Sequence, residues 1–575
     1  MIYITDLSLC TPRSALSSEA AQGRWQTITY ETCSEEPGKG IMLAAASFVD
    51  APEIRLPLHV SGWHSVYIGF WNLHFDYDMA GTTIRVKLSD DPAFIPINEP
   101  QPDIDYSGTS LGEAFFKAAD LTGRDLIFAK IGGPFARKAY IAYVKLVPLS
   151  EEEVVSLLRE RSAIEARTLQ GAIDGWSYFG SGEYKSKEQL LEMVEKFRYS
   201  NVGKLIWACN YGDLTNYPSQ TGIFLGGEPK VPIPAIPGNN SYIAGAKVWC
   251  ETFKELASKG LIPQALIGEH VHQMGLKFDA MFRLSIIGDL PGCREMAGKR
   301  PFVRSHPEFR QVTKRGVPTE KASYAFPEVR TFMLSIIQES MERFPFDGAN
   351  LCFCRGGHHT LYDNPVLEDF RKEFGEDGRG VPFDDPRMAK IRCRYLTTFV
   401  RDTRRLLDDI GRRKGKRLEL SVMVWRDTEE NRLCGCDVET WVKEGMLDSI
   451  LLLNGGSPQV PPISGDLTRF ERISPKFVDT ARANNCKVIC FSQSYDKQSS
   501  LARNLLWGHE AGVDGFGIWD IDGALASSAW GDICDKVSDR AAMESLAEAP
   551  SRLKSIKLKT VGGYDVMELA IYSGG

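Results

Sequence analysis

Residues 327–363 read PEVRTFMLSIIQESMERFPFDGANLCFCRGGHHTLYD. The first part predicts a helix over 327–343, and the apolar run Gly348–Cys354 has the length and composition of a buried strand. This run ends abruptly at Arg355 and is followed by two glycines, two histidines, a tyrosine and a carboxylate. Such residues do not suit the interior of a strand, so the pattern predicts a strand that leads directly into a binding site.

The same alternation of helix and strand continues on both sides of this unit, from about Gly171 onward. The predicted strands are Ala172–Phe179, Lys204–Cys209, Phe278–Leu284, Gly348–Cys354, Leu418–Trp425, Ser449–Leu453, Lys487–Ser492 and Gly515–Trp519. The predicted helices between them include 187–199, 242–258, 327–343, 387–412, 437–445, 474–484 and 498–511. Eight short strands alternating with helices are typical of a (β/α)8 TIM barrel, an α/β fold. A doubly wound sheet is the main alternative, but no glycine-rich phosphate loop follows an early strand.

The chain before the barrel has a different rhythm, with short runs rich in Val, Ile, Tyr and Trp between turn residues. This pattern predicts a β-sandwich accessory domain over 1–149, followed by a linker helix over 150–169. The catalytic barrel is predicted over 170–545 and a C-terminal β-hairpin over 546–575. The hairpin packs either on the barrel or on the sandwich. The sandwich either binds carbohydrate or has a structural role, which its aromatic residues within strand runs slightly favour.

The composition narrows the class of protein. The 575 residues are 43% hydrophobic with a formal net charge of -7, and no Lys/Arg cluster suggests a nucleic-acid partner. No apolar run is long enough for a membrane span, and the N-terminus lacks the pattern of a secretory signal. We therefore expect a cytoplasmic protein, although a secreted chain without its signal would look the same. The sequence does not decide whether the protein forms a homo-oligomer.

The 13 cysteines show no repeated spacing, and many lie in apolar runs, which is typical of reduced thiols in a core. The CFC and CGC pairs lack the two-residue spacers of most zinc sites. The sequence therefore predicts neither a metal nor a cofactor.

Active sites of such barrels lie at the carboxyl ends of the strands. There the sequence places aromatic, amide and charged residues after nearly every strand. In chain order these are Trp176, Tyr178, Glu183, Asn210, Asp213, Asn216, Tyr217, Arg283, Arg355, His358, His359, Tyr362, Asp363, Trp425, Arg426, Asp427, Asn454, Gln493, Tyr495, Asp496, Trp519, Asp520 and Asp522. Sugar rings lie with their C–H faces on Trp and Tyr, and their hydroxyls need directional partners such as Asp, Asn, Gln and Arg. The set therefore predicts a carbohydrate as the partner.

Several stretches resemble a group of known sequences. They are SYAFPEVRTFMLSIIQESMERFPFDGANLCFCRG, the following YDNPVLEDFRKEFGED with its Arg-rich helix, GDLTNYPS and HPEFR. They resemble the glycosyl-hydrolase-like (β/α)8 families of the "glycosyl hydrolase-like 10" kind, over roughly residues 170–525. The resemblance implies a TIM barrel and a carbohydrate-active enzyme.

The sequence departs from these families at one important position. Related barrels carry an acidic residue inside the fourth strand, whereas this chain has Cys352 there. Asp363 matches an acid that related sequences carry slightly later. Glutamates at the ends of strands four and seven, as in retaining hydrolases, are also absent.

The leading hypothesis is a glycoside hydrolase that uses two carboxylates. We predict Asp363 as one, with Asp213, Asp427 or Asp520 as its partner, Arg355 orienting a carboxylate and His359 assisting. The predicted substrate-binding residues are Trp176, Tyr178, Asn210, Tyr217, Arg283, His358, Tyr362, Trp425, Asn454, Gln493 and Trp519. Two alternatives remain: a non-catalytic carbohydrate-binding barrel, suggested by Cys352, and a sugar lyase or isomerase with His358 or His359 as base.

Overall fold

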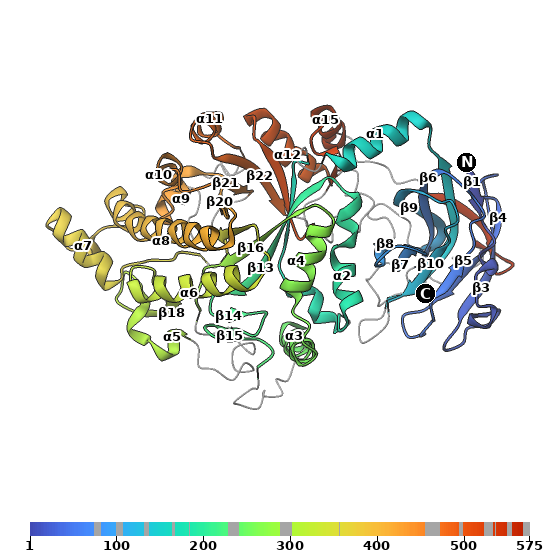
Figure 1. Ribbon diagram of the computed structural model, residues 1–575, viewed down its shortest axis with the longest axis horizontal. Coiled ribbons are helices and arrows are strands. Elements are labelled where there is room, and N and C mark those ends of the chain that lie inside the picture. Colours follow the sequence, from blue (N-terminus) through green and yellow to red (C-terminus); the bar gives the residue numbers. More distant parts are fainter. Residues whose placement is uncertain are drawn as a thin grey trace.

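The computed structural model contains a closed barrel of eight parallel strands (Figure 1). Around the barrel these are β12 (Leu169–Ile173), β13 (Val202–Tyr211), β16 (Lys277–Arg283), β19 (Gly348–Cys352), β20 (Glu419–Trp425), β21 (Ser449–Leu453), β22 (Lys487–Gln493) and β23 (Gly515–Trp519). Parallel pairing of β12 with both β13 and β23 closes the ring. The predicted TIM barrel is confirmed, and the ring excludes a doubly wound sheet.

The structure describes the chain except residues 74–81, 99–106, 132–136, 164–166, 183, 228–240, 288–301, 356, 455–471, 494–497, 522–532, 535, 549–554 and 567–575.

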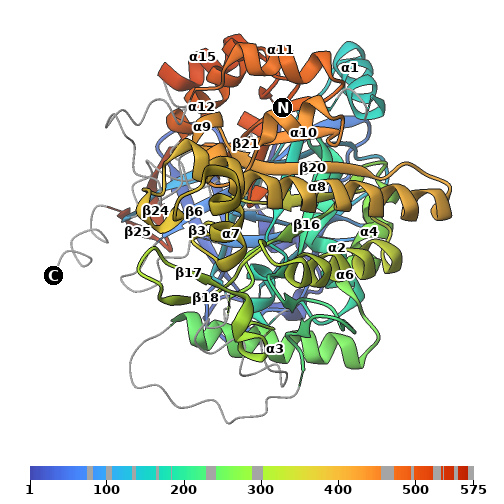
Figure 2. The same ribbon diagram turned by 90° about the vertical axis from the view of Figure 1, so that its left-hand side faces the viewer.

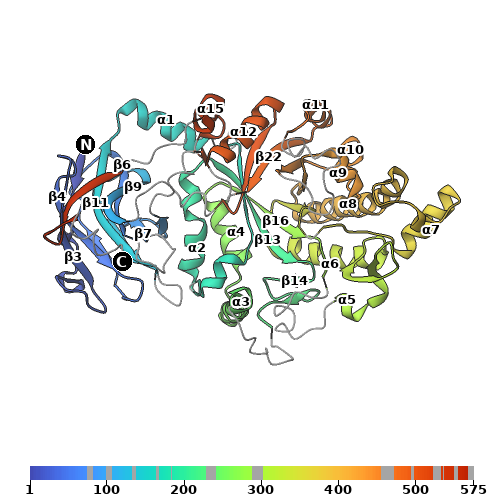
Figure 3. The same cartoon turned by 180° about the vertical axis from the view of Figure 1, so that it is seen from behind.

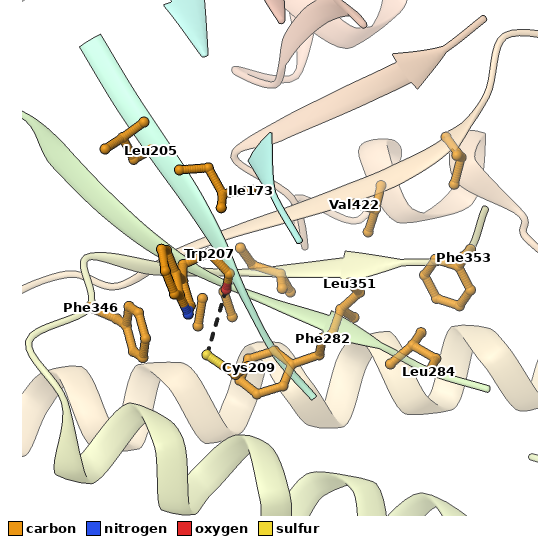
Figure 4. Packing of buried hydrophobic residues seen from close by; sticks show 14 of the residues in the cluster. Ile173, Leu205, Trp207, Cys209, Phe282, Leu284, Phe346, Leu351, Phe353 and Val422 are labelled. Atoms are coloured by element: carbon orange, nitrogen blue, oxygen red, sulfur yellow. Dashed lines mark hydrogen bonds between the residues drawn. The ribbon is translucent and has the colours of Figure 1, made fainter. Parts of the chain in front are cut away.

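The barrel strands are apolar along their whole length because both of their faces are buried. In β21 all five residues, SILLL, are buried. The inward side chains, among them Met281, Met423 and Phe491, fill the barrel. Residue 517 is a glycine where a Cβ atom would collide with the Phe491 ring. The outward side chains form a second layer against the helices, where Trp207 and Phe282 pack with residues of other strands (Figure 4).

The helices cover the outside of the barrel. They include α2 (Lys187–Glu195), α3 (Ser241–Ser258), α4 (Pro263–Gln273), α6 (Pro327–Arg343), α7 (Asn364–Phe374), α8 (Pro386–Lys414), α9 (Thr428–Leu433), α10 (Val438–Lys443), α11 (Pro475–Ala483), α12 (Gln498–Ala511) and α15 (Arg540–Glu548). The longest, α8, begins where Asp385 caps the N–H of Arg387 and ends at Gly415 in the left-handed conformation. It lies beside α6 (Figure 2). No helix in the described ranges is long and apolar enough to cross a bilayer.

The N-terminal region is β-rich and forms two sheets. The larger contains β1 (Ile2–Ile4), β2 (Leu16–Ser17), β3 (Trp25–Thr32), β4 (Lys39–Ala45), β6 (Trp63–Leu73), β9 (Ser107–Asp120), β11 (Ala139–Pro148), β24 (Ile556–Val561) and β25 (Tyr564–Asp565). The smaller contains β5 (Ile54–Leu56), β7 (Thr83–Leu88), β8 (Ile95–Asn98) and β10 (Leu126–Lys130). One hydrophobic cluster includes side chains of both sheets.

The C-terminal hairpin returns to this region, which decides between the two predicted positions. Strand β24 pairs with β9 on one side and with β3 on the other, so the larger sheet runs around a ring. Figure 3 shows the red β24 among the blue strands of the N-terminal region. The two ends of the chain therefore share one sheet, although the whole barrel separates them in sequence.

Side-chain contacts join the β-rich region to the barrel. Helix α1 (Glu151–Ser162) begins with a capping box formed by Ser150 and Glu153 and leads from β11 toward the barrel. Arg85 of β7 forms an ion pair with Glu192 of α2. The Lys117 ammonium of β9 lies 4.5 Å from the ring centroid of Tyr199, which follows α2. Charged and aromatic contacts thus fix the accessory region against one side of the barrel.

Candidate active site at the mouth of the barrel

The mouth of the barrel is the end at which the eight strands finish, and strand register shows which residues point inward there. Trp519 of β23 pairs with Gln493 of β22 and with Ala172 of β12. Arg283 of β16 pairs with Cys352 of β19. Trp519, Ala172 and Cys352 belong to the inward-facing cluster. Because paired residues in a sheet share a face, Arg283 and Gln493 point inward beside them.

Arg283 is surrounded by aromatic rings at this level. Its guanidinium carbon lies 5.3 Å from the ring centroid of Trp519, 5.8 Å from that of Tyr211 and 6.0 Å from that of Trp176. These distances are typical of cation–π contacts. The side chain is 8% exposed. Four strands therefore supply one cluster of a cation and three rings, of which only Tyr211 was not predicted.

A second arginine joins this cluster from β19. The guanidinium carbon of Arg355 lies 4.9 Å from the ring centroid of Trp519, so two cations share one indole. The positive charges of Arg283 and Arg355 act on the nearby Cys352 thiol. Burial raises the pKa of its thiol, and the positive charges of Arg283 and Arg355 lower it by a smaller amount. Cys352 is therefore a neutral thiol at pH 7 and brings no negative charge to the mouth.

Two carboxylates follow neighbouring strands at the mouth. Asp520 comes directly after Trp519 and has a φ of 52°, a left-handed conformation that interrupts the alternation of the strand. Asp174 follows β12, and its Oδ1 accepts a hydrogen bond from the N–H of Trp176 at 2.9 Å. Since Ala172 pairs with Trp519, Asp174 and Asp520 follow adjacent strands at the same level of the barrel. Both side chains are half-buried.

Asp174 is the carboxylate that sequence reasoning missed. The first barrel strand was predicted to continue to Phe179, which made Asp174 an interior strand residue. In the structure β12 ends at Ile173 and a 3-10 helix, Ser177–Ser181, follows. Gly175, in the left-handed conformation, was the available signal of this early end.

Asp363, which the sequence predicts as a catalytic carboxylate, lies among the long loops that follow β16 and β19. It is fully buried at the start of α7. It accepts hydrogen bonds from the N–H of Val312 at 2.7 Å, the N–H of Leu361 at 2.9 Å and the hydroxyl of Ser323. Both oxygens are therefore engaged within the protein, and Asp363 joins three segments of the long loops.

The two other predicted carboxylate partners also have structural contacts. Asp213 is fully buried in the turn between β13 and β14 (Leu214–Thr215), where it accepts the N–H of Phe302 at 2.8 Å. Asp427 is the N-cap of α9 and accepts the N–H of Glu430 at 2.7 Å. Asp213 and Asp427 therefore each hold the backbone of a turn or a helix start with one oxygen. Asp520 is the one member of the predicted partner set that we retain.

The histidines are poor candidates for a catalytic base. His359 is 2% exposed, and its ring lies 5.4 Å, between centroids, from the rings of both Tyr324 and Phe353. Burial lowers its pKa to about 4. Burial and nearby positive charges lower the pKa of His358 to about 3, and its ring packs on Phe383. Both stay neutral at pH 7 and are packed among aromatic rings.

Four predicted sugar-binding residues are instead part of the framework. Tyr217 is fully buried, with its hydroxyl 2.7 Å from that of Ser340. Tyr362 donates to the carbonyl of Val381 at 3.1 Å. Asn210 bridges β13 and β16 through backbone groups of Gly212 and Arg283.

Tyr178, the fourth, packs edge-on against Tyr184 beside the barrel. Asn216 and Arg426 bond to backbone carbonyls in the same structural way.

The remaining predicted residues divide into two groups. Trp425 is half-buried and packs against the inward-facing cluster, and Asn454 directly follows β21, so both lie at the mouth with Gln493. Glu183, Tyr495, Asp496 and Asp522 lie outside the described residues. In the part of the chain that the structure describes, no three His, Cys, Asp or Glu side chains are grouped to hold a metal ion.

Comparison with known proteins gives similarity at the level of solved structures alone. No protein-family model matches the sequence, and no curated protein is significantly similar to it. The PgaB (BpsB) glycoside hydrolase domain from Bordetella bronchiseptica is 12% identical, with a TM-score of 0.38 over 67% of this chain and 99% of that one. The catalytic domain of β-amylase from Paenibacillus polymyxa is 10% identical, with a TM-score of 0.35 over 67% and 100%. Alpha-L-fucosidase isoenzyme 2 from Paenibacillus thiaminolyticus is 13% identical, with a TM-score of 0.37 over 65% and 50%. At these values the similarity carries no argument about activity, which depends on the residues of the mouth.

Proposed function

We propose that this protein is a glycoside hydrolase whose active site is the mouth of the barrel. The observation that carries the proposal is the pair Asp174 and Asp520, which leave neighbouring strands beside Trp176 and Trp519. A glycosidase needs two carboxyl groups, about 5 Å apart for retention and roughly 6.5–9.5 Å apart for inversion. The pairing of Ala172 with Trp519 supports the proposal, because it puts the two aspartates after adjacent strand ends.

The surroundings of the pair suit a sugar. Tyr211 and Trp425 are half-buried rings at the mouth, and Gln493 offers an amide donor and acceptor. We assign Asp174 and Asp520 as the acid and the nucleophile or base, with the order of the two roles open.

The test is a mass-spectrometric screen of products from a broad panel of glycosides in water labelled with 18O. Wild type, Asp174→Asn, Asp520→Asn and the control Asp409→Asn are compared. Asp409 lies on the outer helix α8 and pairs with Arg412 there. We expect labelled free sugar from wild type and the control, and a loss of at least about 100-fold in each mouth variant. Turnover that survives in both mouth variants would refute the assignment.

A non-catalytic sugar-binding barrel is the second candidate. The neutral, fully buried Cys352 favours it, because the inward position of β19 carries no acid. In that case sugars raise the melting temperature of the wild type and no panel member yields product. The lyase or isomerase hypothesis has weaker support, since a pKa of about 3 for His358 and about 4 for His359 makes both rings weak bases and both pack against aromatic rings.

A further inference from the structure

Arg283 presents an unbalanced charge at the mouth. Its backbone is fixed, because its N–H donates to Asn210 Oδ1 at 3.0 Å and its carbonyl accepts the N–H of Gly212 at 3.0 Å. Its side chain is more than nine-tenths buried, and its Nε has no hydrogen-bond partner. Among the described residues no carboxylate lies within 4.0 Å of its guanidinium. A buried cation normally has a paired anion, since desolvation otherwise costs several kcal/mol.

The strand partner of Arg283 does not supply this anion, because the paired residue is Cys352, a neutral thiol. The guanidinium of Arg355 lies over the same Trp519 ring, so an anion bound to Arg283 also lies near a second cation. A planar carboxylate or a sulfate accepts two parallel N–H bonds from a guanidinium.

We propose that the mouth of the barrel binds a sugar carrying an anionic group, a carboxylate or a sulfate ester, and that Arg283 binds this group with Arg355 beside it. The inference rests on the proposed function, in that it places the sugar at the mouth of the barrel. The anionic substituent of the sugar then points to β16 and β19. Neutral sugars leave Arg283 without its partner and bind more weakly.

Calorimetric titration of the full-length protein tests this with matched ligands. The methyl glycosides of glucose, galactose and mannose are compared with the corresponding uronides and 6-sulfates, at low and at physiological salt. We expect at least one anionic member to bind at least about tenfold more tightly than its neutral counterpart, with the advantage reduced by salt. The two anionic series distinguish a carboxylate from a sulfate.

Arg283→Gln should abolish this preference. The control Arg412→Gln should retain it, because Arg412 is exposed at the end of α8. Arg283→Lys keeps the charge without the planar fork and should retain only part of the preference. If Arg283→Gln does not fold, as judged by circular dichroism, Arg283→Lys and Arg355→Gln provide the readout.

Three outcomes overturn the inference: equal or tighter binding of every neutral member, a preference that survives in Arg283→Gln, or no binding of any sugar. The result is separable from the test of the proposed function. Hydrolysis of a neutral glycoside that depends on Asp520, together with equal or tighter binding of every neutral member, leaves the hydrolase intact and overturns the anionic ligand. Selective binding of an anionic sugar that is never cleaved supports the anionic ligand and overturns the hydrolase.

Discussion

Replacing Asp363 tests whether this residue is structural, as its contacts indicate, or catalytic, as its place in the sequence suggests. Asp363→Ala removes the acceptor of two backbone N–H groups, those of Val312 and Leu361, and of the Ser323 hydroxyl. Each buried donor left without a partner costs about 1–3 kcal/mol. The hydroxyl can rotate to another acceptor, so we count the two backbone groups and expect a loss of roughly 2–6 kcal/mol in the free energy of unfolding.

Urea denaturation at pH 7 measures this loss as a shift of the midpoint. Asp363→Asn keeps one accepting oxygen and should lose roughly half as much stability. Below the unfolding transition, the turnover of the folded fraction should stay within about threefold of wild type, since loss of a general acid costs 10²–10⁴-fold. A variant with a normal midpoint and turnover reduced more than about 100-fold would refute the structural role.

Three further predictions concern buried ionisable groups. Because the pKa of His359 is about 4 when folded and near 6.5 when unfolded, wild type should lose about 3 kcal/mol as the pH falls from 6.5 to 4. His359→Leu should lose less over that range in urea titrations, and an unchanged slope would contradict the assigned burial. Lys204 lies 2.8 Å from Asp279 and 2.6 Å from Glu419, so Lys204→Met should cost about 3–5 kcal/mol. The double variant Lys204→Met with Asp279→Leu should regain most of the stability lost in Lys204→Met. If it does not, the unpaired Asp279 carboxylate is not the cause of that loss. Burial alone would raise the pKa of Asp347. Hydrogen bonds from His272, the N–H of Phe278 and Lys416 together outweigh burial and hold the pKa below its usual range. The ionised Asp347 therefore stabilises the folded state above pH 4, and this stabilisation is lost as the pH falls through the folded pKa. Asp347→Asn should make the free energy of unfolding depend less on pH below pH 4. Equal acid midpoints of the variant and wild type would refute this.

The barrel was predictable because its signal is local and repeated. A strand buried on both faces must be a short apolar run, and SILLL at 449–453 is buried at every position. The predicted bounds of this strand and of Gly515–Trp519 agree with β21 and β23. The end of the first strand was predicted wrongly, because the aromatic residues of a 3-10 helix have the same composition as a strand.

The candidate site was predictable as a region, but its members were not. Trp519, Arg283 and Arg355 converge as expected, because parallel strands deliver their ends to one face of the barrel. Asp363 and His359 follow β19 in the same loop as Arg355, yet both are buried among the loops. Position along the chain does not specify the direction of a loop side chain, which depends on partners such as Ser323.

The sequence alone therefore determined the eight-stranded barrel, the β-rich region before it and the set of residues near the strand ends, because periodicity and burial are properties of neighbouring residues. The tertiary structure decided which carboxylates occupy framework hydrogen bonds, as Asp363 does. It also decided that β24 pairs with β3, since contacts between residues about 530 positions apart have no local signature. The pairing of Ala172 with Trp519, the two residues whose strands lead to Asp174 and Asp520, is a contact of the same kind.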